Sequence, residues 1–412
     1  MRKQKSFAIG YSMVINSMLA WWVWAALTNT GMNAWIPAFV GKFGWERTTL
    51  LNFSTVGSLL AVISSLICAW IVMKKGTKWI TVAGYIMTGI FVIIFGRVST
   101  VAGYALCVIA FQILSNTYGG VTTNTVISNW FPKRKAVVLG ITTIGMPLAS
   151  FCFVPLLTKL LNAGGISSAF LYIGVGIIIL GIVNIFWLKD RPQDVGLYPD
   201  NIKPDQEQDA AMSGVAYQTK WTLKKLLLNK NAWLIAVGYG ILFLVTQGMV
   251  SQTVSYLIEF GFAQPMAVTM LSVCAAIGMA GSFIWGVVDQ KTSTKKASLI
   301  FAVWFIVTFI LLGLQLNLPM VILGLIFLGL ALGGSGNLLP SMIITTYGPK
   351  EFASANRIVY TLSCVVRSFA FMVMAVGLRL FGTYKGATWI LMILSVVAFL
   401  CIIPIDKKDR VD

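Results

Sequence analysis

The feature that most constrains the fold of this chain is a series of apolar runs that recur along its whole length. A helix needs about 20 apolar residues to cross a hydrocarbon core of ~30 Å, and these runs reach that length. The sequence is 58% hydrophobic and 11% charged, with a mean hydropathy of +0.84, which lies outside the range of soluble globular domains. We therefore predict an all-α membrane protein with twelve spans, over residues 11–38, 48–73, 79–98, 102–127, 136–159, 168–188, 231–258, 265–288, 297–314, 319–345, 356–380 and 387–405.

The distribution of Lys and Arg predicts the orientation of these spans, because cytoplasmic loops carry basic residues in excess. With the amino terminus inside, 24 of the 31 basic residues fall in cytoplasmic segments and six on the opposite side. We expect a multi-pass protein of a bacterial cytoplasmic membrane, with both termini in the cytoplasm. The run from Leu19 to Leu27 continues into a full span without a cleavage pattern, so we expect the first helix to be retained.

The same loops account for the net charge of +18, so the lipid bilayer is the expected partner and no nucleic acid is indicated. The chain has no histidine, and every Asp and Glu lies in a loop, a tail or a helix end. A nucleophile at depth would therefore have no base. The six cysteines are scattered through apolar spans, which indicates neither disulfides nor a metal site. We predict no enzyme activity, no metal and no cofactor, and we expect a monomer.

The two halves of the chain repeat at an offset of 217 residues. Residues 29–45 align with 246–262, matching the Gly-Met and Phe-Gly pairs of both segments. An even number of spans separates the two copies, so the repeat is parallel and its axis runs along the membrane normal. We predict an amino-terminal six-helix half over residues 1–188, a charged cytoplasmic linker over 189–230 and a carboxyl-terminal six-helix half over 231–412.

Twelve spans in two parallel halves joined by a charged linker resemble the major facilitator superfamily. Within it, the segments FGWERTTL (43–50) and NWFPKRKAVVLGITTIG (129–145) are similar to the branch of oxalate/formate antiporters and monocarboxylate transporters. The resemblance covers essentially the whole chain. It implies the major facilitator fold and a carrier whose two halves rock about a central site.

The resemblance also implies a cytoplasmic gate in the loop between helices 2 and 3 and in its copy between helices 8 and 9. The first loop, AWIVMKKGTKW (69–79), lacks the usual acid, whereas the copy, GVVDQKTSTKK (286–296), keeps one. We expect that acid to lie near the positive start of helix 5, although a solvated helix-end aspartate is an equally good interpretation. The predicted gate residues are Lys74, Lys78, Arg134, Asp289 and Lys291.

Arg367 is the only charged residue that the sequence places at mid-depth, about 16 Å into helix 11 at 1.5 Å per residue. Burying a lone cation costs at least ~2.5 kcal/mol, and no Asp or Glu in the spans can pair with it. Tyr360 shares its helix face. A forked donor beside aromatic rings suits a carboxylate, so we predict that Arg367 binds an anionic substrate; the alternative is an arginine bonded to carbonyls between helices.

Other polar residues lie on helices that line the cavity in the resembled superfamily. Any one of these amides could instead bond across a helix interface, but as a set they favour a binding site. The Trp-rich segment WWVW (21–24) is interpreted as packing or an interface anchor rather than as a stacking platform. The predicted substrate-binding set is Arg367, Tyr360, Asn29, Asn33, Gln112, Asn116, Tyr118, Gln247 and Asn337.

These observations predict a secondary active transporter that moves a small organic anion by alternating access, as an exchanger or a facilitated carrier. A span 266–285 without a basic residue leaves a single cation at depth, which favours a monocarboxylate over a compact dianion. Two alternatives stay open: an efflux carrier for a hydrophobic compound, and a membrane sensor that binds a ligand without transporting it.

Overall fold

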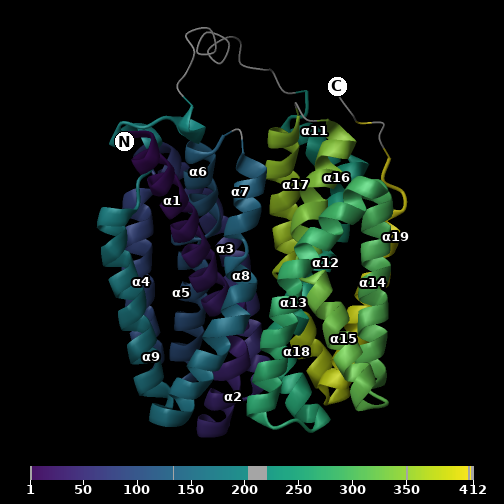
Figure 1. The fold of residues 1–412 in the computed structure, drawn as a ribbon. Coiled ribbons are helices and arrows are strands. Elements are labelled where there is room, and N and C mark those ends of the chain that lie inside the picture. The colour runs from purple at the N-terminus through teal and green to yellow at the C-terminus, as the bar shows by residue number, and fades with distance from the viewer. Residues whose placement is uncertain (1, 133, 203–219, 349–350, 407–408, 410–412) are drawn as a thin grey trace.

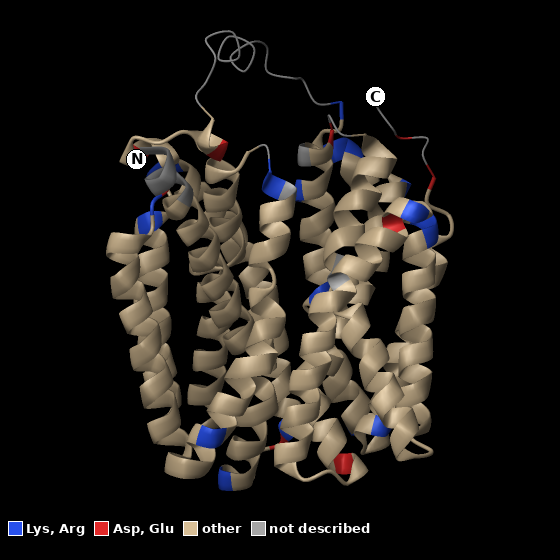
Figure 2. Cartoon of the chain, viewed as in Figure 1, with Lys and Arg blue, Asp and Glu red and all other residues tan. Residues whose placement is uncertain are grey.

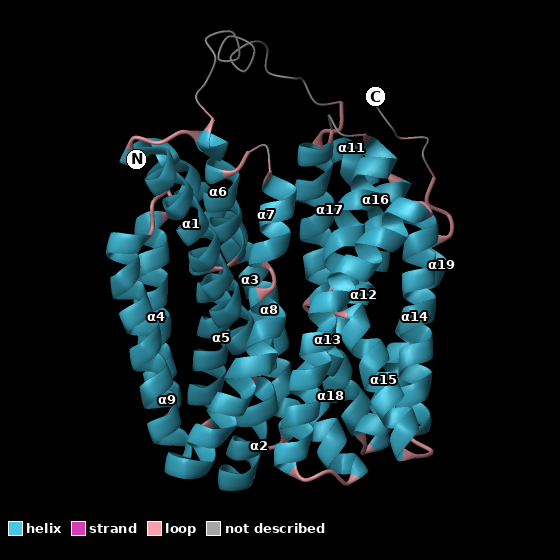
Figure 3. Ribbon diagram, viewed as in Figure 1, coloured by secondary structure: helices cyan, strands magenta, loops and turns pink. Residues whose placement is uncertain are grey.

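The computed structural model describes residues 2–132, 134–202, 220–348, 351–406 and 409, and in this part of the chain it contains helices and connecting turns but no strand (Figure 3). Residues 203–219 of the predicted linker lie outside the described residues. The apolar composition explains this architecture, because a backbone in lipid must satisfy its hydrogen bonds within the segment.

The helices stand in two groups side by side (Figure 1). The first group, purple to teal, contains α1 (Arg2–Ala25), η1 (Ala26–Thr30), α2 (Met32–Phe43), α3 (Arg47–Lys75), α4 (Lys78–Phe95), α5 (Val101–Tyr118), α6 (Gly120–Trp130), α7 (Lys135–Thr142), α8 (Gly145–Leu148), η2 (Ala149–Phe153) and α9 (Val154–Trp187). The second group, green to yellow, contains α11 (Leu223–Leu228), α12 (Lys230–Phe260), α13 (Gln264–Lys291), α14 (Thr294–Leu314), α15 (Leu318–Ala331), α16 (Gly334–Tyr347), α17 (Phe352–Arg367), α18 (Ala370–Phe381) and α19 (Tyr384–Ile402).

Both ends of the chain lie on one side of the molecule, here called the terminal side; the opposite side is the distal side (Figure 1). Two short turns, η3 (Pro192–Val195) and η4 (Pro199–Asn201), follow α9 on the terminal side. Lys and Arg gather near the two ends of the helices, mostly at the terminal side (Figure 2). The middle of the molecule is therefore almost free of charge.

Nine helical segments of the described chain are long and apolar enough to cross a membrane, or ten if the bent pair α15 and α16 is one span. One of the nine, Val137–Trp187, holds two of the twelve predicted spans, because the chain turns back at Gly165 (φ 72°). The first predicted span corresponds to α1, η1 and α2 together. The all-α membrane fold is confirmed, and the lower number of segments reflects breaks and mergers of the predicted spans.

Five of the predicted spans are interrupted inside the molecule. The first and fifth contain the π-helical turns η1 and η2, and the fourth, tenth and eleventh break at Gly119, at Leu332–Gly333 and at Ser368–Phe369. By contrast, α3, α4, α12, α13, α14 and α19 run without a break. In lipid, irregular backbone is tolerated only where protein or a polar cavity satisfies it. The interruptions therefore mark the interior of the molecule.

Each group has its own aromatic packing. In the first group, the ring centroid of Phe95 lies 4.8 Å from that of Phe39 and 4.9 Å from that of Phe170. In the second group, Trp285 and Phe301 meet edge to face at 4.6 Å. Such offset and edge-on contacts are the favoured geometries of aromatic pairs, and they give each bundle a rigid interior.

Hydrogen bonds join the two groups on the distal side. The Asn33 side chain donates to the Val250 carbonyl at 2.7 Å and accepts from the Val254 amide at 2.9 Å. Val250 stands 217 residues after Asn33, so Asn33 contacts its own counterpart in the sequence repeat. A residue and its symmetry mate touch only where the symmetry axis passes. The contact therefore places the pseudo-two-fold axis between η1–α2 and α12.

Candidate functional site

Arg367 is the last residue of α17, immediately before the break in the eleventh predicted span. The Ser368 amide bonds to the carbonyls of Cys364 and Val365, and α18 begins at Ala370. The negative end of α17 stabilises a cation in its last turn, while the first amides of α18 carry the positive end of the next helix dipole. Arg367 thus ends one helix three residues before the next helix begins.

The face of Trp24 lies against this guanidinium, with the Arg367 Cζ atom 5.8 Å from the indole centroid. Trp24 comes from α1 in the first group, so the contact crosses between the two groups. Gly119 makes room for the indole, because a Cβ at that position would lie 2.7 Å from Trp24 Cδ1 and 2.8 Å from the Ser115 carbonyl. Cation–π contacts are worth ~0.5–1 kcal/mol when exposed and about 2 when desolvated. Trp24 therefore holds the cation without neutralising it.

Tyr360 lies two turns before Arg367 on α17, and its hydroxyl neighbours the guanidinium. Its side chain is 42% exposed in the structure. Ser363, between them on the same face, is buried and donates to the Val359 carbonyl at 2.9 Å. The structure thus brings together two members of the predicted set, Arg367 and Tyr360, and adds Trp24 to them.

The predicted amides of the first group are mostly engaged by backbone. Gln112 is buried and donates to the Thr28 carbonyl at 2.9 Å, and Asn116 donates to the Ala61 carbonyl and to Ser64 Oγ, both at 2.9 Å. Asn29 lies in η1 and differs from them, because its Oδ1 is buried without a hydrogen-bond partner among the described residues. Among these three amides, Asn29 is therefore the one whose side-chain oxygen is free to accept a hydrogen bond.

The remaining members of the predicted set come from four different helices, α2, α5, α12 and α16. Tyr118 is buried, stacks on Tyr85 at 4.5 Å between centroids, and has a hydroxyl without a partner in the described chain. Asn33 is fully buried and bound to α12 on the distal side, as described above. Gln247 is half-buried on α12 and Asn337 is exposed on α16.

Among the described residues, no hydrogen bond or ion pair between the predicted gate residues is found. Lys74 and Lys78 lie over the rings of Trp70 and Trp79, at 4.1 and 5.5 Å from the centroids. Arg134 and Lys291 are exposed. Asp289 is half-buried, and its Oδ1 has no partner among the described residues.

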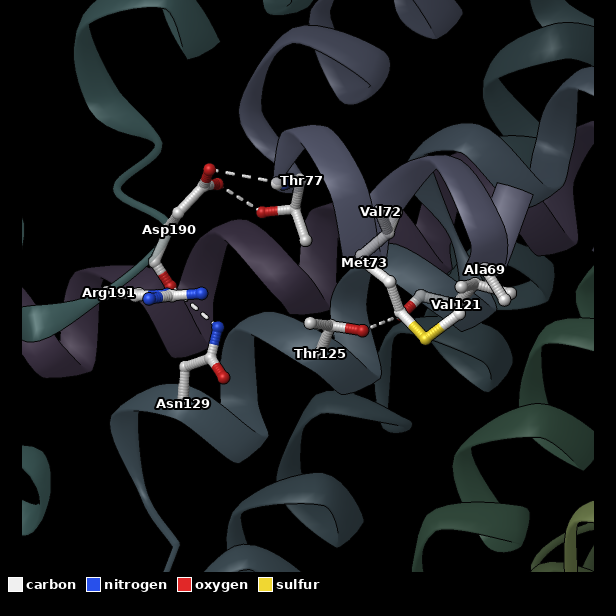
Figure 4. A pocket seen from close by; sticks show the side chains of 10 residues that line it. Ala69, Val72, Met73, Thr77, Val121, Thr125, Asn129, Asp190 and Arg191 are labelled. Atoms are coloured by element: carbon white, nitrogen blue, oxygen red, sulfur yellow. Dashed lines mark hydrogen bonds between the residues drawn. The ribbon is translucent and has the colours of Figure 1, made fainter. Parts of the chain in front are cut away.

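The acid missing from the loop between helices 2 and 3 is supplied from another part of the chain. Asp190, just after α9, accepts hydrogen bonds from the Thr77 hydroxyl and, at 3.2 Å, from the Thr77 amide (Figure 4). The Asp190 carbonyl in turn accepts from Asn129 at 3.1 Å. An acidic side chain at a helix amino end is favourable, so Asp190 ties the start of α4 to the ends of α6 and α9.

A cavity of about 350 Å³ lies beside this junction, lined by Ala69, Val72, Met73, Gly76, Thr77, Val121, Thr125, Asn129, Asp190 and Arg191 (Figure 4). Its lining contains none of the residues predicted to bind substrate. No pattern in the sequence singles out Asp190, because its contact with Thr77 joins residues 113 apart. Trp24 was visible in WWVW, but its position against Arg367 depends on the break at Gly119.

Comparisons with known proteins agree with this architecture. A family model described as Major Facilitator Superfamily matches residues 12–371. The oxalate:formate antiporter of Oxalobacter formigenes is 26% identical over 215 residues, which cover 50% of this chain and 46% of that protein. The match thus spans about half the length of this curated relative.

Solved structures share the fold over nearly the whole chain. An inward-facing, occupied bacterial homologue of the human lysosomal transporter Spinster superposes with a TM-score of 0.72 at 14% identity, covering 99% of this chain and 98% of that one. The nucleoside transporter NupG gives 0.73 at 15% identity, covering 96% and 99%. A D-xylose-proton symporter gives 0.73 at 12% identity, covering 98% and 99%. At these identities the likeness concerns the fold alone.

Proposed function

This chain belongs to the Major Facilitator Superfamily of membrane transporters. From that premise we propose that it carries a small organic anion, most readily a monocarboxylate, across the bacterial cytoplasmic membrane. It works by alternating access, as an exchanger or facilitated carrier. Its two halves, residues 1–188 and 231–412, rock about the centre of the molecule, and the segment 189–230 links them on the cytoplasmic side.

The observation that carries the proposal is Arg367 at the helix break. No ion pair to this guanidinium is found in the described chain, and its close neighbours are the uncharged Trp24 and Tyr360. A desolvated cation without a counter-ion is costly. A bound carboxylate would remove that cost, because it matches the guanidinium fork.

The curated relative supports the same substrate class, since its name states that it exchanges oxalate for formate. The single cation at depth favours one carboxylate over two. Around Arg367, we propose that Tyr360 and Asn29 offer a hydroxyl and a free carbonyl oxygen to the rest of the substrate. Gln247, Gln112, Asn116, Tyr118, Asn33 and Asn337 complete the candidate set, some of them after the halves have moved.

The orientation belongs to the same proposal. The excess of basic residues on the terminal side (Figure 2) supports a cytoplasmic location of that side. Lys74, Lys78, Arg134, Asp289 and Lys291 then form a cytoplasmic gate that closes in the opposite state of the cycle. Their separation here is what an open cytoplasmic side requires.

The experiment is counterflow in proteoliposomes with labelled formate, acetate, lactate and oxalate. Arg367→Ala should abolish exchange, and Arg367→Lys should restore only part of it, because a lysine keeps the charge but loses the fork. Arg97→Ala, an exposed arginine at the distal end of α4, is the matched control and should behave as wild type.

Undiminished exchange in Arg367→Ala would refute the anchor role of this residue. Counterflow of none of the four anions by the wild-type protein would refute the substrate class. Binding without counterflow would point to a sensor, and export of hydrophobic dyes in place of anions to an efflux carrier.

A further inference from the structure

A second arginine, Arg47, links the two groups on the distal side. It is the first residue of α3, and its Nη1 donates to the Tyr384 hydroxyl of α19 at 2.7 Å. The guanidinium also lies 5.5 Å from the centroid of the same ring. Tyr384 is 3% exposed and donates onward to Gln252 Oε1 of α12 at 2.8 Å. A chain of hydrogen bonds thus runs from the first group into the interior of the second.

The acids near this contact are committed elsewhere. Glu46 accepts from the hydroxyls of Thr48 and Thr49, and these bonds hold the pKa of its carboxyl below the usual value. Glu259 accepts from the amides of Tyr384 and Lys385, at 2.8 and 3.2 Å, and so caps α19. The charge of Arg47 is therefore met by a phenol and not by a carboxylate.

A neutral partner makes the contact exchangeable. A phenol offers the guanidinium one uncharged oxygen, whereas a carboxylate offers two oxygens and a negative charge in the geometry of the fork. An anion from solution is thus a better partner for Arg47 than Tyr384 is. Tyr384 accepts from Nη1 and its ring lies near the guanidinium, so a carboxylate that binds across Nη1 and Nη2 must displace Tyr384.

We propose that Arg47 is a gate-controlled anion site at the distal mouth: Tyr384 occupies it while the distal side is closed, and the carboxylate of an arriving substrate takes it when that side opens. This inference rests on the proposed function for the class of ligand, and adds a second point of anion recognition. Arg47 stays with the first group and Tyr384 leaves with the second. Anion binding at Arg47 therefore competes with closure and favours the open state by its differential affinity.

Two variants distinguish an anion site from a latch, that is, a contact that only holds the distal side closed. Arg47→Gln removes both the latch and the anion donor, whereas Tyr384→Phe removes the latch and leaves Arg47 free. Lys42→Gln is the matched control, because Lys42 is an exposed cation on the same side that lies over Phe43, at 5.0 Å, outside the network.

The assay is uptake of labelled formate and labelled oxalate into cells that express each variant, with the outside concentration varied. Arg47→Gln should raise the outside KM about tenfold, a change typical of losing one charged contact. Tyr384→Phe should leave this KM unchanged or lower it, and Lys42→Gln should match wild type. Arg47→Lys should fall between Arg47→Gln and wild type, and shows that a loss in Arg47→Gln is not a folding defect.

Equal KM changes in Arg47→Gln and Tyr384→Phe would overturn the anion site and leave a latch. An unchanged KM in Arg47→Gln would overturn it as well. If the wild-type protein takes up neither anion, the proposed function and this inference fail together, whereas a failure of this inference alone leaves wild-type uptake intact. Hydrogen exchange of residues 44–50 and 383–387 should rise in both latch variants and not in Lys42→Gln; no rise would overturn the gate.

Discussion

Replacing Asn33 by alanine is expected to shift the protein towards a state that is open on the distal side. The Asn33 amide makes two hydrogen bonds to α12, at 2.7 and 2.9 Å, and both cross between the groups. Their partners, the Val250 carbonyl and the Val254 amide, are four residues apart and so are natural helical partners of each other. After truncation these two groups can satisfy one another, so no orphaned polar group adds to the effect.

The size of the shift follows from the two lost bonds. Interhelical hydrogen bonds in membrane proteins average ~0.6 kcal/mol each. Two of them amount to about 1.2 kcal/mol, which corresponds to an about sevenfold change in the ratio of open to closed states. The closed state loses this stabilisation and the open state, in which the groups are apart, does not.

Asn16→Ala is the matched control. Asn16 is also buried and donates to Asn184 Oδ1 at 2.7 Å, but both residues belong to the first group. Its removal should lower the free energy of unfolding by a similar amount without redistributing the two states. Any difference between the variants then reports on the contact between groups.

Hydrogen–deuterium exchange of the protein in nanodiscs measures the shift. Exchange of residues 40–50 and 380–388 tracks the population of the open state, so Asn33→Ala should exchange about sevenfold faster there than wild type. Asn16→Ala should match wild type in these segments. Equal rates in Asn33→Ala and Asn16→Ala would refute the view that Asn33 holds the distal side shut.

Three further predictions follow from particular contacts. Gly119→Ala should displace Trp24 from Arg367 and cost ~1–3 kcal/mol by overpacking, with loss of counterflow, whereas Gly120→Ala, where the nearest atom would be 3.7 Å away, should be tolerated in both assays. Asp190→Ala should lower thermal stability by about 1 kcal/mol through the lost cap of α4, more than Asp194→Ala at an exposed turn. Counterflow at saturating substrate should change little between about pH 6 and pH 8, because the chain has no histidine and no acid at mid-depth; a steep pH profile abolished by a protonophore would contradict this.

The sequence was sufficient to predict the membrane fold, because a membrane span is recognised from its own length and composition. The 217-residue register was sufficient to relate Asn33 to Val250, and the structure shows these residues in contact. Counting along a helix also predicts that Arg367 lies at mid-depth, which stays a prediction. These predictions depend on periodicity and local composition, which one chain contains in full.

Contacts between distant segments were beyond reach of the same reasoning. Asn33 was predicted to bind substrate, which stays a prediction, yet its amide is engaged by α12 here. Nothing in the pattern of residues 26–34 distinguishes an amide that faces a neighbouring helix from one that faces a cavity. Asp190 shows the same limit, because the amide it binds lies 113 residues away.

The helix break beside Arg367 and the charge itself have different origins. Ser368 and Phe369, shifted by 217 residues, fall at 151 and 152, inside the π-helical turn η2 of the first group. The irregular backbone is therefore a property of both copies of the repeat, as expected for helices that must bend when the groups move. The counterpart of Arg367 is Ser150, also in η2, whose carbonyl lies 3.4 Å from the Ser272 hydroxyl of α13. Since the same backbone feature accommodates a serine in one group, the break does not require a cation. Under the proposed function, Arg367 is explained by the anion it binds, and the asymmetry of the charge puts that anion off the pseudo-two-fold axis, towards the second group.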